Sequence, residues 1–293
     1  MPIPTNSLAA LISAASWGMG DFSGGMGVKS APPEANQTGA ALRVVLFSHL
    51  TSFSFLLLIA LFRNDPLPHG IPLLAGLLAG LCGGLSLAAF YIALSRGAMG
   101  ASAALSGLLA AAIPAAVSLV QEGSPGPHRL LGFLVAGIAI WLIAAGPAQR
   151  EQLSTVLLSI SAGIGFGLYF VALKVAGTGT GPVWAMASAR VGSISTCLVV
   201  LFAFRALGSP TGPVAISRRM LLWIFSTALF DTCGNLLFVT STRSGRLDIA
   251  AVLASLYPAS TILLAAAILH ERLTRRQLIG MTIAIAAVLL ITL

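Results

Sequence analysis

The sequence predicts an all-α membrane protein with ten transmembrane helices in two inverted five-helix repeats. Three observations predict this fold class: an apolar composition, ten apolar stretches in succession, and a residue pattern that recurs between the two halves. The chain of 293 residues is 57% hydrophobic and 8% charged, with a mean hydropathy of +0.96. Because soluble domains carry roughly 25% charged residues, we expect this chain to have lipid as its solvent.

The apolar stretches define the predicted helices in order. A bilayer core about 30 Å thick requires about 20 mostly apolar residues per helix. The stretches are Leu8–Gly25, Ala40–Phe62, Ile71–Leu94, Ala98–Val120, Leu130–Ala145, Leu153–Ala176, Val183–Leu207, Met220–Ser241, Ile249–Leu269 and Leu273–Leu293. Their connections are too short for an extramembrane domain, which excludes an ATPase within this chain.

A duplication relates the two halves. Residues of the same type recur at equivalent places in the predicted helices, and the run Phe90–Gly97 corresponds to Phe238–Gly245 at a shift of 148. The recurring pairs are Glu122 with Glu271, Arg43 with Arg190, and Gly132 with Gly280, separated by 149, 147 and 148 residues. We therefore expect one repeat in residues 1–147 and another in residues 148–293. Five helices is an odd number, so the second repeat enters the membrane from the opposite side, as in many transporters.

Motifs in the second half resemble the closing pattern of an EamA-type domain in the drug/metabolite transporter superfamily. They are Ala254-Ser-Leu-Tyr-Pro-Ala259, Glu271-Arg-Leu-Thr274 and Gln277-Leu-Ile-Gly280, and Trp17-Gly18, Arg43 and Arg190 resemble the same family. The first half departs from this pattern, with Leu108-Leu109 in place of Tyr-Pro. The resemblance implies a ten-helix exporter whose fifth and tenth helices are peripheral. It also implies a central cavity and cytoplasmic termini.

Two carboxylates lie inside predicted helices. An ionised carboxylate in a bilayer costs several kcal/mol unless it faces a cavity or a partner, so Asp21 and Asp231 are functional-site candidates. Asp231 lies near the middle of its helix with Asn235 one turn later, and Phe238 extends this stretch. Asp231 is predicted to hold a substrate ammonium or a coupling proton, and the alternative is a hydrogen bond that fastens two helices.

The first predicted helix presents an aromatic ring and a carboxylate on one face. Trp17 and Asp21 have the spacing i, i+4. The glycine-rich run Gly18–Gly27 around them permits close packing, kinking or local unwinding, which suits a moving gate. The alternative is that Trp17 lies in an interfacial belt and the glycines only pack.

Three tyrosines are further candidates for the cavity wall. Tyr91, Tyr169 and Tyr257 fall in the third, sixth and ninth predicted helices, where such rings stack a flat substrate or bond its polar end. Pro258 and Pro114 each free a backbone carbonyl inside the membrane, so each is expected to mark a kink.

His49 and two arginines complete the candidates. His49 can titrate near neutral pH, so it joins Asp21 and Asp231 as a possible coupling residue, although a satisfied hydrogen-bond partner is the favoured reading. Arg43 and Arg190 either anchor a substrate carboxylate or extend from the helix ends to the membrane interface. A structural role is preferred for both.

The sequence carries no other recognisable chemistry. It lacks nucleophile, metalloprotease and phosphate-loop motifs, so we expect no catalytic residues, no metal and no cofactor. The sixteen Lys and Arg residues are scattered singly at the ends of apolar segments, which argues against nucleic-acid binding. Cys82, Cys197 and Cys233 fall inside apolar segments and are expected to pack helices.

We expect a secondary transporter or facilitator that exports small organic metabolites by alternating access through a central cavity. Neutral or aromatic amino acids are the leading substrate class. Efflux of cationic or hydrophobic drugs is the alternative within transport, and a lipid-handling or structural membrane protein is the alternative outside it. Besides substrate and bilayer no partner is expected, and a monomer is plausible.

The membrane orientation depends on two conflicting signals. Five Lys and Arg residues fall on the terminal face and nine on the opposite face, which by the positive-inside rule places the termini outside. The resemblance implies cytoplasmic termini in the inner membrane, and we follow it. Proton exchange and facilitated diffusion both remain open.

Overall fold

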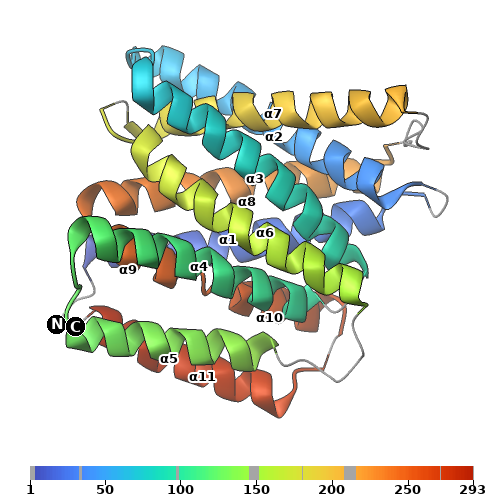
Figure 1. The fold of residues 1–293 in the computed structure, drawn as a ribbon. Helices are drawn as coiled ribbons and strands as arrows, with labels where there is room; N and C mark the ends of the chain where they lie inside the picture. The colour runs from blue at the N-terminus through green and yellow to red at the C-terminus, as the bar shows by residue number, and fades with distance from the viewer. Residues whose placement is uncertain are drawn as a thin grey trace.

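The computed structural model describes residues 4–32, 35–96, 99–144, 152–179, 181–207, 216–270 and 272–292, and in these ranges the regular elements are all helices (Figure 1). The helices are α1 (Thr5–Lys29), α2 (Gln37–Arg63), α3 (Gly70–Arg96), α4 (Met99–Glu122), α5 (Pro127–Ala144), α6 (Leu153–Ala176), α7 (Gly181–Ala206), α8 (Arg218–Ser244), α9 (Leu247–Ala254), α10 (Pro258–Ile268) and α11 (Arg275–Thr292). Since α9 and α10 form one span, the described helices make ten spans, and the predicted all-α membrane fold is confirmed.

Eight of these spans are long and apolar enough to cross a membrane by length and composition. The two exceptions have separate causes. In α5 the apolar segment Pro127–Ile143 is short. In α1 the run of Gly, Ser and Asp lowers the apolarity, but this helix is largely buried among α8, α10, α9 and α3. A helix that contacts protein on most sides tolerates polar residues that a lipid-facing helix does not.

Side-chain caps fix the ends of two spans. Asn36 precedes α2 and accepts a hydrogen bond from the Gly39 amide at 3.1 Å, and Ser217 precedes α8 and accepts one from the Met220 amide at 3.1 Å. Such caps satisfy amides that the first helical turn leaves unpaired. Each helix therefore begins at a position set by its own sequence.

The two halves run in opposite directions through the bundle. In Figure 1, α1 begins at the end of the bundle where α11 finishes, whereas α6 begins at the opposite end. This is the inverted arrangement predicted from the odd number of spans per half. The predicted repeat boundary between residues 147 and 148 lies outside the described residues and stays a prediction.

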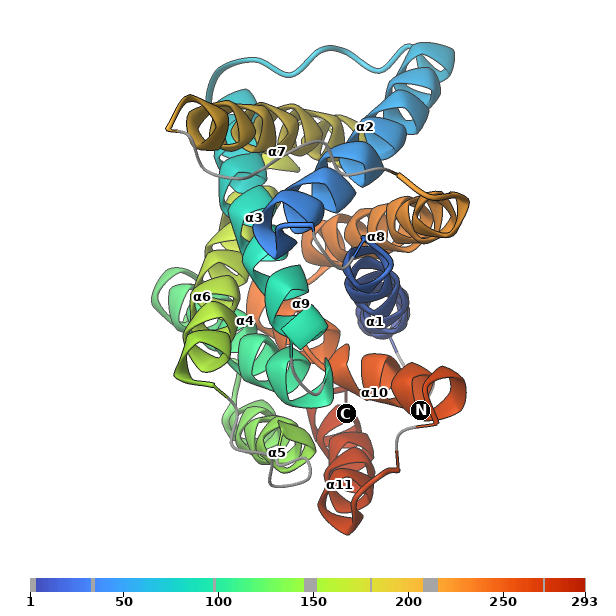
Figure 2. The same cartoon turned by 90° about the vertical axis from the view of Figure 1, so that its right-hand side faces the viewer.

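The principal helix contacts join one half to the other. α1 packs along α8, and its counterpart α6 packs along α3; α2 packs on α7, α4 on the α9–α10 span, and α5 on α11. Exchanging the halves reproduces the same set of pairs. The pair α5 and α11 lies to one side of the bundle in both views, as expected for the fifth and tenth spans (Figures 1 and 2).

The two predicted proline kinks have different outcomes. Pro258 begins α10, and the three residues before it form turns that separate α9 from α10. Pro114 lies inside α4, which continues through it as one helix from Met99 to Glu122. The break therefore occurs in one half only, although the two spans pack against each other.

The crossing of α3 and α7 depends on two glycines. A Cβ atom at Gly80 would lie 2.0 Å from the carbonyl oxygen of Ala189, and one at Gly192 would lie 2.2 Å from that of Leu77. Because these neighbours are backbone atoms, any larger residue would push the helices apart. The close approach brings α7 against the middle of α3.

An ion-pair cluster ties three spans together at the end of the bundle where α1 begins. Lys174 at the end of α6 pairs with Glu122 at the end of α4. Arg246, before α9, pairs with Asp248 at 2.8 Å and donates to the backbone carbonyls of Glu122 and Gly123 at 3.1 and 2.6 Å. The cluster joins α4, α6 and α9 at this face.

Candidate functional site

A central pocket lies among the helices of both halves. Its wall is formed by α1, α2 and α3 from the first half and by α6, α7, α8 and the α9–α10 break from the second. The lining residues are Trp17, Asp21, His49, Gly80, Gly83, Gly84, Leu87, Phe166, Tyr169, Phe170, Ala189, Arg190, Ser193, Asp231, Asn235 and Tyr257. The peripheral helices α5 and α11 contribute none of them.

Equivalent positions of the two halves face the same pocket but carry different chemistry. At the shift of 148 residues, Asp21 of α1 corresponds to Tyr169 of α6. Asp231 and Asn235 of α8 correspond in the same way to Gly83 and Leu87 of α3. At these positions the two halves share a place in the pocket wall but not the same charge.

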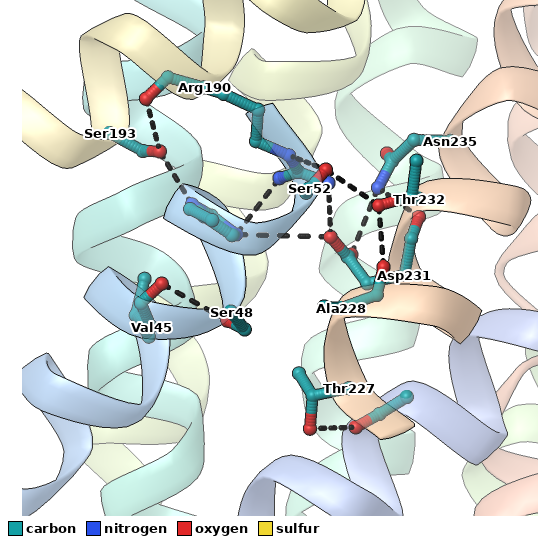
Figure 3. Close-up of polar contacts among 12 residues, drawn as sticks. Val45, Ser48, Ser52, Arg190, Ser193, Thr227, Ala228, Asp231, Thr232 and Asn235 are labelled. Carbon is teal, nitrogen blue, oxygen red and sulfur yellow. Dashed lines mark hydrogen bonds and ion pairs between the residues drawn. The ribbon is translucent and has the colours of Figure 1, made fainter. Parts of the chain in front are cut away.

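Arg190 and Asp231 form the centre of a polar network (Figure 3). The guanidinium donates through Nη2 to Oδ2 of Asp231 and through Nε to the Ser52 hydroxyl at 2.9 Å. The side chain of Arg190 is 3% exposed and that of Asp231 is 14% exposed. A buried ion pair of this kind is stable only when further hydrogen bonds satisfy its remaining groups.

His49 is held between Arg190 and Ser193. Its Nε2 atom lies 2.8 Å from Nη1 of Arg190, and its Nδ1 atom lies 2.5 Å from the Ser193 hydroxyl. A guanidinium has donors only, so Nε2 must accept, and the remaining proton of the neutral ring belongs on Nδ1. In this arrangement His49 is uncharged.

The other side of Asp231 is bonded within α8 and to α6. The Asn235 amide nitrogen donates to Oδ1 of Asp231 at 2.9 Å, and the Tyr169 hydroxyl donates to Oδ1 of Asn235 at 2.6 Å. Thr232 donates to the Ser52 hydroxyl at 2.6 Å, which connects α8 to α2 (Figure 3). The groups bonded to Asp231 are therefore themselves held by further hydrogen bonds.

Aromatic rings form a second part of the pocket wall. Trp17 stacks on Phe170 with ring centroids 4.9 Å apart and an interplanar angle of 2°, and both rings contact Phe238 at centroid distances of 5.4 and 4.8 Å. Gly234 makes room for the indole, because a Cβ atom there would lie 2.5 Å from Cδ1 of Trp17. The aromatic group fixes the orientation of Trp17 at the pocket edge.

Asp21 differs from every other charged residue of the pocket. Its exposed fraction is 8%, it lines the pocket, and no residue of the described chain gives it a hydrogen bond or an ion pair. Asp231 is the charged group within electrostatic range of it, and the two charges have the same sign. A buried carboxylate without a partner costs free energy that a ligand or a proton can offset.

Comparison with known proteins identifies the second half. Residues 153–293 match the model of the EamA-like transporter family, which belongs to the drug/metabolite transporter superfamily. This half of the chain is an EamA-like transporter domain. The family comprises membrane transporters of small molecules and not enzymes.

The fold of the whole chain has a counterpart among solved structures. One crystal structure aligns with 100% of this chain and 99% of its own, with a TM-score of 0.75 and 15% sequence identity. At this identity the likeness shows the fold alone. No curated protein gives a significant match.

The structure brings most of the predicted site residues together. The EamA-like domain supplies Tyr169, Asp231, Asn235 and Tyr257 to the pocket, and the first half supplies Trp17, Asp21 and His49. The Tyr257 hydroxyl also bonds Ser106 of α4 at 2.6 Å, at the break between α9 and α10.

Two predicted wall residues lie outside the pocket. Phe238 is fully buried behind Trp17 and Phe170, so those rings screen it. Tyr91 is fully buried against α1, where a Cβ atom at Gly24 would lie 2.1 Å from Cζ of its ring, and its hydroxyl has no partner in the described structure. Both side chains pack behind the residues that line the pocket.

For two further features the structure decides between alternatives that the sequence left open. Arg190 does not reach the interface, since it is buried beside Asp231, whereas Arg43 stays near the start of α2 and donates to the Gly39 carbonyl at 3.0 Å. The glycine run of α1 does not unwind, because Thr5–Lys29 is one continuous helix. Its glycines allow close packing instead, as at Gly24.

Sequence reasoning overlooked several residues of the pocket and of the polar network beside it. Phe166 and Phe170 lie on either side of Tyr169 in α6, and the spacing of i, i+4 between them was a usable signal for a shared face. Ser193 and Ser52 hold His49 and Arg190, but single serines in apolar helices are too common to stand out. No cluster of three metal-ligating side chains occurs among the residues that the structure describes.

Proposed function

We propose that this protein exports small organic metabolites that carry an amino group, with neutral or aromatic amino acids as the leading class. The observation that carries the proposal is the central pocket, which both halves line and which combines uncompensated negative charge with aromatic rings. Membrane transport of small molecules is the function class of the EamA-like domain, and the pocket supplies the chemistry of the substrate.

The charged groups support this substrate class. Asp21 offers acceptors for an ammonium group, and Arg190 uses three of its five N–H groups within the protein. Trp17, Tyr169 and Phe166 offer apolar surface for a side chain. An amino acid with an apolar side chain uses all three kinds of contact.

Alternating access is supported by how the halves pack. Each principal contact pairs a helix of one half with a helix of the other, so exchanging the conformations of the halves preserves the set of pairs. In the proposed cycle the pocket opens first to one face and then to the other. Asp21, which has no protein partner, is the coupling residue if protons are exchanged, while Asp231 and His49 are held in the network.

Transport in proteoliposomes tests the proposal. We expect labelled phenylalanine and leucine to show counterflow, with competition by other neutral amino acids and no flux in liposomes without protein. A pH gradient should drive accumulation only if protons are exchanged. Absence of flux for every amino acid tested would contradict the proposed substrate class.

Efflux of cationic drugs is a second candidate. The unpaired carboxylate of Asp21 one turn from Trp17 favours it, because a lipophilic cation binds between negative charge and aromatic faces. Flux of tetraphenylphosphonium without any amino-acid flux would select this candidate. A lipid-handling role predicts no flux of either compound.

We place the protein in the inner membrane with cytoplasmic termini. Labelling of single cysteines introduced near Thr5 and Thr292 in intact cells tests the orientation. Protection of both sites from an impermeant reagent is expected, and labelling of both would reverse the orientation.

A further inference from the structure

We propose that Asp21 binds the ammonium group of the substrate and that this pocket selects for the amine, not for a carboxylate. The inference rests on the proposed function, because it assigns a chemical class to the same pocket. It extends that function to aryl- and alkylamines that lack a carboxylate.

The charge balance of the pocket is the first argument. Arg190 and Asp231 neutralise each other, and His49 is neutral because Arg190 donates to its Nε2 atom. The carboxylate of Asp21 is then the one uncompensated charge among the described lining residues. A ligand with a single positive charge restores neutrality.

The hydrogen-bond donors are the second argument. Arg190 donates to His49, Ser52 and Asp231, the Asn235 amide donates to Asp231, and the Tyr169 hydroxyl donates to Asn235. Protein acceptors thus take three of the five N–H groups of Arg190 and the donors of Asn235 and Tyr169 named here. The two oxygens of Asp21 are acceptors that receive no protein donor, so an ammonium group with three N–H donors matches them.

The surroundings of Asp21 are the third argument. Trp17 lies one turn before it on the same face of α1, Phe170 of α6 stacks on the indole, and Tyr169 contacts Phe170 in the pocket wall. Aromatic faces attract a cation and also cover an apolar substituent. The class that fits is a monoamine with an aromatic or branched aliphatic body.

Competition binding with three related compounds tests the selectivity. The probe is radiolabelled 2-phenylethylamine on purified protein in detergent, and the competitors are 2-phenylethylamine, L-phenylalanine and 3-phenylpropanoate. We expect the two amines to compete at similar concentrations and 3-phenylpropanoate to fail at about a hundredfold excess. Competition by 3-phenylpropanoate, or failure of both amines to bind, overturns the proposal.

Variants of Asp21 test the residue. We expect Asp21→Asn to weaken 2-phenylethylamine binding by about tenfold or more, and Asp21→Glu to retain part of it, since the lost contact is a charged hydrogen bond. Asp65→Asn is the matched control, because Asp65 pairs with the exposed Arg63 outside the pocket. Unchanged binding by a monodisperse Asp21→Asn protein would contradict the assignment.

Counterflow in proteoliposomes made from the same purified proteins separates the two proposals. Amine binding that depends on Asp21, with no flux of any compound, removes the transport proposal and leaves the amine site. Phenylalanine flux that Asp21→Asn does not change removes the amine site and leaves the transport proposal.

Discussion

Two carboxylates face the central pocket from the adjacent helices α1 and α8, and their surroundings differ. Asp231 is bonded to Arg190 and Asn235 and lies 3.8 Å from His49. Asp21 has no such partner within the described chain. The protein therefore compensates one buried charge internally and leaves the other to be compensated from the pocket.

Within this one site, Asp231 is expected to act on the stability of the fold and Asp21 on ligand binding. A compensated charge contributes to the native packing, and its removal leaves its partner buried without a counter-ion. An uncompensated charge contributes nothing to packing, so its removal should leave the fold intact and change what the pocket binds. Variants of Asp231 should therefore lower stability, whereas variants of Asp21 should change ligand binding and leave stability intact.

The largest loss of stability is expected for Asp231→Ala. This change leaves the Arg190 guanidinium buried and without its counter-ion, which costs about 3–5 kcal/mol of the free energy of unfolding. Thermal unfolding of the purified protein in detergent measures the loss.

The double variant Asp231→Leu with Arg190→Met is the control for that result. It removes both charges together, so most of the stability should return even though the network is gone. Equal melting temperatures for Asp231→Ala and the unchanged protein would show that the ion pair does not stabilise the fold.

A smaller loss of stability is expected for Tyr169→Phe. The change keeps the ring and removes the hydroxyl that donates to Oδ1 of Asn235 at 2.6 Å, at a cost of about 1 kcal/mol. Unfolding measurements on this variant show whether the network of Asp231 extends to α6. A loss as large as that of Asp231→Ala would mean that Tyr169 is essential to the whole network.

The smallest effect on stability is expected for Asp21→Asn. Because no protein group pairs with this carboxylate, its melting temperature should equal or exceed that of the unchanged protein. Thermal unfolding without ligand measures this. A loss comparable with that of Asp231→Ala would reveal a structural partner and end the contrast between the two residues.

The fold was largely predictable because the bilayer imposes a simple length rule. Ten spans, the inverted halves and the peripheral pair agree with the sequence-based expectations. The breaks were harder to predict. Pro258 and Pro114 give the same local signal, yet a helix ends before Pro258 and continues through Pro114. A proline removes one hydrogen bond in either case, and the packing around it decides whether the helix continues.

The site was predictable residue by residue but not as a network. A carboxylate inside an apolar span stands out, which is how Asp21 and Asp231 were found. The partners of Arg190 could not be predicted, because position along a helix does not reveal which helix lies opposite. Its partners His49 and Asp231 are 141 and 41 residues away in the chain, so their contact exists only through tertiary packing.

The ion-pair cluster of Glu122, Lys174, Arg246 and Asp248 has a consequence for the proposed transport cycle. Glu122 has a charged counterpart in Glu271, but at the shift of 148 residues the positions equivalent to Lys174, Arg246 and Asp248 are Met26, Ala98 and Gly100, which carry no charge. Exchanging the conformations of the halves would therefore break ion pairs at one face without forming equivalent pairs at the other. If the protein alternates as proposed, its two end states would have unequal free energies, and salt, which screens exposed pairs, would shift the population toward the state that opens at the cluster.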